Sequence, residues 1–70
     1  MSYYDDVMRI MSDGSPHTTS EVVELLYPNI DRYERKNKIV RIGRTLLSAN
    51  RHRDVEIVGV DGKSRIFRKR

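Results

Sequence analysis

Apolar positions with helical spacing divide most of the chain into three segments. In residues 2–12, apolar side chains recur at helical spacing and charged side chains lie between them, as in an amphipathic helix. Residues 19 to 26 or 27 repeat the pattern with valine and leucine, and a third, longer helix is expected over about residues 32–49. At about 100° per residue, one side of this third helix gathers the apolar or small residues Ile39, Ile42, Gly43, Leu46 and Leu47.

The second and third helices each begin with a capping signal. Thr18 stands three residues before Glu21, and Asp31 stands three residues before Glu34. In this arrangement the first side chain accepts from a backbone N–H one turn on, and the glutamate reaches back to the N–H of the cap residue. Pro28 disfavours helical geometry at the residue before it, so we expect the second helix to end there.

Two glycines mark positions of different kinds. Gly14 follows the first helix, where a left-handed residue commonly ends a helix. Gly43 lies within the third helix, where glycine costs about 1 kcal/mol relative to alanine. We therefore expect a close helix crossing at Gly43. Between the first two helices, proline favours a short extended piece over residues 16–18.

The end of the chain changes to the pattern of strands. A connection over residues 50–54 leads to a β-branched strand over 55–60. Asp61-Gly62 is typical of a two-residue hairpin turn, and 65–68 is the expected return strand. With that turn we expect Ile57 to pair with Ile66 and Val58 with Arg65; the alternative is a longer loop that includes Lys63 and Ser64. The chain is thus predicted to be an α+β protein.

Composition limits the possibilities further. Seventy residues form one domain, spanning residues 1–70. The absence of cysteine excludes disulfides and thiolate metal sites. No apolar run is long enough to span a membrane, and no secretory signal is visible, so an intracellular protein of the cytoplasm, nucleoid or nucleus is expected.

Charge is unevenly distributed along the chain. Residues 1–31 contain six acidic residues and one basic residue, a net charge of −5. Residues 32–70 contain thirteen basic and four acidic residues, a net charge of +9. This separation favours a polyanionic partner for the second half. The alternative is mutual neutralisation of the two halves by internal salt bridges.

The order of these elements resembles the winged helix-turn-helix family over nearly the whole chain. Residues 17–22 are similar to the family's entry into its second helix, residues 39–50 to its recognition helix, and residues 55–68 to its wing. The resemblance implies three helices followed by a β-hairpin wing, with residues 16–18 as a short extra strand. It also implies a recognition helix of about 32–49 in the major groove of DNA, with the wing on the flanking backbone.

Candidate contact residues are cationic or hydrogen-bonding. At the start of the third helix, cations beside outward-pointing N–H groups suit phosphate. Further along, arginine, lysine and asparagine suit base edges, while tyrosine and threonine suit phosphate or thymine. The recognition-helix candidates are Arg32, Tyr33, Arg35, Lys36, Asn37, Lys38, Arg41, Arg44 and Thr45. Those on the wing are Lys63, Ser64 and Arg65, with Ser20 as a weaker candidate at the second helix.

Other kinds of chemistry find little support. No nucleophile, base and orienting group share a recognisable spacing, and no glycine-rich phosphate loop is present, so we expect neither an enzyme nor a cofactor site. The two histidines are far apart, which disfavours a metal site. Double-stranded DNA is therefore the expected partner, bound by a small transcriptional regulator.

Two alternatives to duplex DNA remain open. Winged-helix domains also serve as protein adaptors, and here the acidic first helix with Asp5, Asp6 and Asp13 would face a basic protein. Structured RNA would suit the same positive charges. The oligomeric state is not specified by the sequence, and dimerisation on DNA is one alternative.

Overall fold

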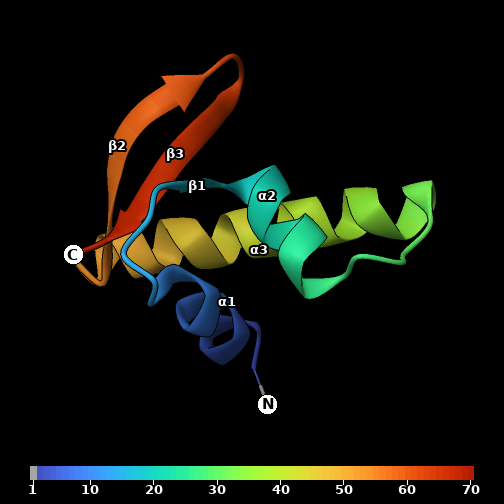
Figure 1. Ribbon diagram of the computed structural model, residues 1–70, viewed down its shortest axis with the longest axis horizontal. Coiled ribbons are helices and arrows are strands. Elements are labelled where there is room, and N and C mark those ends of the chain that lie inside the picture. The colour runs from blue at the N-terminus through green and yellow to red at the C-terminus, as the bar shows by residue number, and fades with distance from the viewer. Residues whose placement is uncertain (1) are drawn as a thin grey trace.

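The computed structural model describes residues 2–70 and confirms a small α+β architecture with three helices and a three-stranded antiparallel sheet. In Figure 1 the β2–β3 hairpin rises from one side of α3, and α1 lies on the other side. Within this part of the chain, no helix combines the length and hydrophobicity needed to cross a membrane. The elements are α1 (Tyr3–Met11), β1 (His17–Thr18), α2 (Thr19–Leu26), α3 (Arg32–Arg51), β2 (Val55–Asp61) and β3 (Ser64–Lys69).

The predicted N-caps of α2 and α3 are confirmed. The Thr18 hydroxyl accepts from the backbone N–H of Glu21 at 3.1 Å, and the Asp31 carboxylate accepts from that of Glu34 at 2.8 Å. The glutamate half of the first capping box differs from expectation, because the Glu21 carboxylate bonds to His17. The side chain therefore joins α2 to β1.

The C-terminal end of α3 lies beyond its predicted boundary. Asn50 and Arg51, expected in a connection, continue the helix. The chain leaves α3 at His52, whose backbone N–H donates to the Ser48 carbonyl at 3.0 Å. Arg53 then takes a left-handed conformation, with φ of 64°, which turns the chain towards β2.

The predicted register of the hairpin is wrong. The two loop residues are Gly62 and Lys63, because Asp61 pairs with Ser64. Gly62 has φ of 64° and Lys63 is not left-handed, which is the pattern of a turn with glycine at its first central position. Asp61 therefore belongs to β2. The residues that were predicted to pair, such as Ile57 and Ile66, do not face one another.

A bulge shifts the register again in β2. Ile57 pairs with Phe67 and Gly59 with Ile66, so the intervening Val58 is the extra residue. The strand order β1-β3-β2 makes β2 an edge of the sheet. A bulge bends and twists a strand, and it hinders pairing with other exposed edges. This matters here because Val60, also on β2, is 67% exposed.

One hydrophobic core joins all three helices to the sheet. Helix α3 contributes Ile42, Leu46 and Ala49, each fully buried. Leu47, expected in the same apolar stripe, is 37% exposed, because the hairpin stands away from α3 at this position. The remaining core residues are Val7, Met11, Val22, Val23, Val55 and Phe67.

A buried histidine ties the loop before β1 to α2. His17 is 8% exposed, its Nε2 lies 2.9 Å from an Asp13 carboxylate oxygen, and its Nδ1 bonds to the Glu21 carboxylate. Burial lowers the pKa of His17, but the hydrogen bonds to Glu21 and Asp13 outweigh burial and raise this pKa above 6.5.

The raised pKa of His17 predicts a pH-dependent stability. A protonated histidine stabilises the fold fully below the pKa of the unfolded state, and this contribution disappears as pH rises through the higher folded-state pKa. We therefore expect the free energy of unfolding to decline as pH increases above 6.5. Urea denaturation at a series of pH values measures this, and His17→Gln is expected to flatten the profile. An equally steep decline in the variant would contradict the assignment.

Candidate nucleic-acid interface

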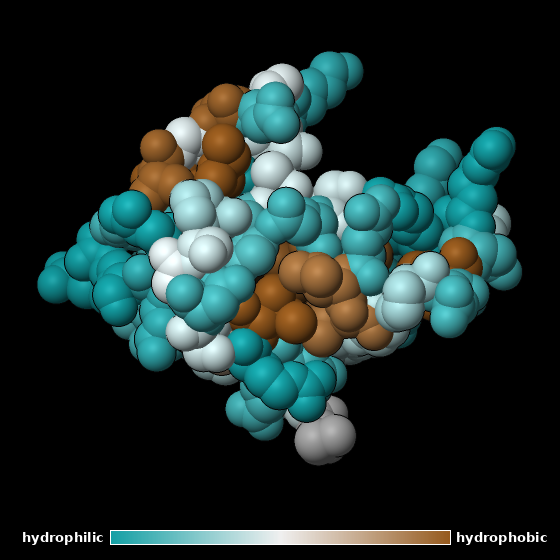
Figure 2. Space-filling view, in the orientation of Figure 1, coloured by the Kyte–Doolittle hydropathy of each residue, from teal (hydrophilic) through white to brown (hydrophobic). Residues whose placement is uncertain are grey.

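A cleft of about 200 Å³ lies between α3 and the hairpin. Figure 2 shows the molecule hollowed between the hairpin tip and the N-terminal part of α3, with hydrophilic residues at the tip and along this part of α3. Inside the cleft the surface is mixed, since apolar side chains lie beside hydroxyl and cationic groups. The residues that line it are Thr19, Ile39, Gly43, Leu47, Lys63, Ser64, Arg65 and Phe67.

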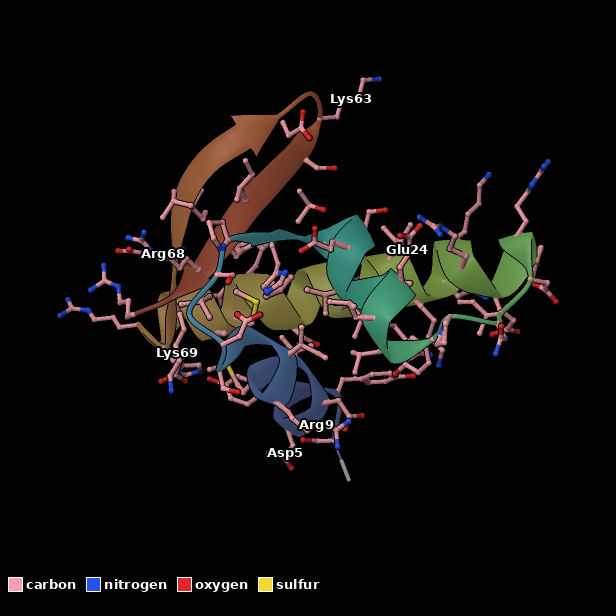
Figure 3. All side chains as sticks on the ribbon, viewed as in Figure 1. Asp5, Arg9, Glu24, Lys63, Arg68 and Lys69 are labelled. Carbon is pink, nitrogen blue, oxygen red and sulfur yellow. The ribbon has the colours of Figure 1, made fainter. Side chains whose placement is uncertain are left out.

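The helix wall of the cleft continues into a row of cations. Lys36 lies one heptad before Gly43, and Arg32 lies one heptad before Ile39, so these residues share a side of α3. Both cations are exposed. On the opposite wall, Figure 3 shows Lys63 at the hairpin tip. The cleft is thus bordered by positive charge on two separate elements.

These border cations are not neutralised within the part of the chain that the structure describes. Arg32 and Lys36 on α3, and Lys63 and Arg65 on the hairpin, form no ion pair with any of residues 2–70. Their charges therefore remain available to an external anion.

Arg35 and Ser20, two further candidates, bind each other. The Arg35 guanidinium donates to the Ser20 hydroxyl at 2.8 Å and to the Glu24 carboxylate at 2.8 Å. Arg35 therefore fixes α2 against the N-terminal part of α3. The local sequence suggested that Arg35 binds phosphate. It could not show that Ser20 and Glu24, which are distant in the sequence, bind this side chain instead.

Lys38 and Arg41 lie on the side of α3 that faces α1. The Lys38 ammonium donates to the Tyr3 hydroxyl at 2.9 Å, and it lies 5.0 Å from the ring centres of both Tyr3 and Tyr27. The hydrogen bond lowers the pKa of the Tyr3 phenol and raises that of Lys38. The Arg41 guanidinium lies 5.8 Å from the Tyr3 ring centre, so both cations are separated from the cleft by the body of α3.

The outer side of α3 carries three of the remaining candidates. Tyr33, Asn37 and Arg44 are exposed and recur at spacings of four and seven residues, so they form one stripe. Tyr33 is the most open of them, at 78% exposed. Thr45 differs, because it is half-buried and its hydroxyl donates to the Arg41 carbonyl of its own helix at 2.9 Å.

The two oppositely charged halves of the chain do not neutralise each other extensively. Among residues 2–70, a single ion pair joins them, between Arg35 and Glu24. Within the acidic half, Asp6 pairs with Arg9 at 3.5 Å and Asp13 pairs with His17. Positive charge is thus left over in the second half, while part of the negative charge around α1 is already compensated.

The apolar floor of the cleft could not be recognised from the sequence. Ile39, Gly43 and Leu47 recur every four residues and were expected in the core. The structure places them along the cleft, where the hairpin stands away from α3. Of the three, Ile39 also packs against the core, as expected. Gly43 does face the start of α2, but a Cβ there would meet Thr19 Cγ2 at 3.6 Å, an ordinary contact. The close crossing expected at Gly43 is therefore not tight enough to require glycine.

Comparison of the chain with protein-family models, with curated proteins and with solved structures found no match.

Proposed function

We propose that the protein is a winged helix-turn-helix domain that binds double-stranded DNA and acts as a small transcriptional regulator. The observation that carries this proposal is the set of cations on both borders of the cleft between α3 and the hairpin that form no ion pair within residues 2–70. Helix α3 is the recognition helix and the hairpin is the wing. Duplex DNA presents phosphates on both sides of a groove, which suits cations on two walls.

The roles of the candidate residues follow from their positions. Arg32 and Lys36 on α3, together with Lys63 and Arg65 on the wing, contact phosphates. The major groove of B-form DNA admits one α-helix, and arginine and asparagine make two-pronged contacts to guanine and adenine there. Asn37 and Arg44 on the exposed outer stripe of α3 are therefore the base-reading residues, with Tyr33 beside them.

Other candidates receive supporting roles in this proposal. Arg35 holds α2 against α3 through Ser20 and Glu24. Lys38 holds α1 through Tyr3. These contacts set the angle at which α3 approaches DNA, and they leave the phosphate contacts to the four cations beside the cleft.

Fluorescence anisotropy with a labelled random-sequence duplex across a salt series tests the proposal. Four phosphate contacts predict that log affinity falls linearly with log salt concentration, with a slope of about −3.6. Absence of binding at about 50 mM salt would overturn DNA binding and direct attention to a protein partner for α1. Tighter binding to an RNA duplex of the same sequence would replace DNA with RNA as the ligand.

A further inference from the structure

Gly43 is a glycine that the protein's own packing does not explain. Its backbone is helical, with no positive φ to favour glycine. An added Cβ would meet no atom closer than Thr19 Cγ2 at 3.6 Å, so alanine would fit. Glycine is nevertheless the poorest helix former other than proline. Gly43 therefore weakens α3 without a compensating close contact among the residues that the structure describes.

The missing side chain opens the cleft. Gly43 lies between Ile39 and Leu47 on the floor of the cleft, and the hairpin forms the facing wall. A glycine allows another backbone or a ligand to approach a helix more closely than any side chain would permit. The place where α3 is bare is thus the place where an occupant of the cleft would contact it.

The lining of the cleft indicates the chemistry of that occupant. Ile39 and Leu47 offer apolar surface, while Lys63 and Arg65 supply positive charge. Phe67 also borders the cleft, but it is almost wholly buried. The hydroxyls of Thr19 and Ser64 add hydrogen-bond donors. A ligand that fits has an anionic group joined to a compact apolar body. The deoxyribose and phosphate of a DNA strand have this combination.

We infer that one sugar-phosphate strand passes through the cleft and packs directly on α3 at Gly43. This inference rests on the proposed DNA binding. The sugar covers the apolar floor, and its phosphate meets Lys63, Arg65 and the two hydroxyls. The recognition helix and the wing then hold the same strand from opposite sides. Gly43 is a steric determinant of DNA binding, although it has no side chain of its own to contribute.

The substitution Gly43→Ala separates this role from a role in folding. We expect the variant to melt about 4–8 °C higher, because alanine is the better helix former. Its affinity for the duplex is expected to fall about tenfold or more, because the new methyl group occupies space that the strand requires. Gly43→Leu is expected to lower the affinity further. Thermal denaturation and anisotropy on the same samples measure both effects.

Gly59→Ala is the matched control. A Cβ at Gly59 would meet its nearest atom, Ile66 Cδ1, at the same distance of 3.6 Å, but Gly59 lies outside the cleft. We expect this variant to bind duplex DNA within about twofold of the unmodified protein, as is usual for changes away from an interface.

The possible results separate the two proposals. If the unmodified protein does not bind DNA, the proposed function fails. If it binds with the expected salt dependence and a stable Gly43→Ala variant binds equally well, only the inference about the cleft fails. Should Gly43→Ala not fold, NMR spectra of the unmodified protein decide. Unchanged amide resonances of Gly43 and Ser64 on addition of duplex DNA would overturn the inference, and shifts of both would support it.

Discussion

Replacing Phe67 with alanine is expected to remove most of the stability of this protein. Phe67 is the largest fully buried side chain, and it lies on the central strand β3 between His17 on β1 and Ile57 on β2. Truncating a buried phenylalanine costs about 3–5 kcal/mol. A domain of 70 residues has a free energy of unfolding of only about 3.5–10 kcal/mol, and small domains lie near the lower end.

Urea denaturation followed by circular dichroism measures the effect of Phe67→Ala. The matched control is Val60→Ala on the same hairpin, where the side chain is 67% exposed. The control is expected to change the free energy of unfolding by less than about 0.5 kcal/mol. A Phe67→Ala variant that unfolds within about 1 kcal/mol of the unmodified protein would show that the core is not organised around this residue.

The double substitution Lys36→Ala and Lys63→Ala is expected to weaken DNA binding about a hundredfold at about 50 mM salt, because each lysine that is removed weakens it about tenfold. Lys36 lies on α3, one heptad before Gly43 on the cleft floor, and Lys63 lies at the hairpin tip on the opposite border (Figure 3). Neither lysine forms an ion pair among residues 2–70. The slope of log affinity against log salt is expected to become shallower by about 1.8. Anisotropy at several salt concentrations measures both quantities.

A second double variant removes the same charge elsewhere. Arg9→Ala with Lys69→Ala also lowers the net charge by two, but Figure 3 shows both residues away from the hairpin tip. If binding depends only on net charge, the two double variants will lose equal affinity, and the assigned interface is wrong. Under the proposed function, the Arg9 and Lys69 variant retains most of the affinity and of the salt dependence.

Features set by near neighbours in the sequence were predictable. The caps at Thr18 and Asp31 need only a side-chain oxygen and an N–H three residues later, and both formed. Gly14, expected to be left-handed after α1, has φ of 77°. The extended piece before α2 pairs with β3 as strand β1, as the family resemblance implied.

Features set by distant partners were not predictable. Ile39 and Leu47 have the spacing of core residues, and only the position of the hairpin leaves them beside an open cleft. Lys38 and Arg35 were predicted to contact DNA, but their side chains bind Tyr3 and Glu24, which lie on other helices. Charge and spacing thus identified a cationic helix, whereas packing determines which of its sides is available.

The hairpin register depends both on near neighbours in the sequence and on distant partners. Both Asp61-Gly62 and Gly62-Lys63 place a glycine in a two-residue turn, so local chemistry permits either loop. The register also depends on how Phe67 enters the core, and the bulge at Val58 accommodates that fit. Turn preferences alone therefore could not specify which residues pair.

The pairing of β1 with β3 also affects the order of events when the chain folds. His17 meets Phe67 across fifty intervening steps of the chain, and closing so long a loop is slow because its entropy is lost before the contacts form. The residues that line the cleft come from both ends of that loop, since Thr19 lies near its start and Arg65 near its end. A chain in which β3 has not yet paired with β1 and β2 therefore has the cationic helix but no cleft. Under the proposed function, binding of a DNA strand in the cleft thus depends on this long-range pairing.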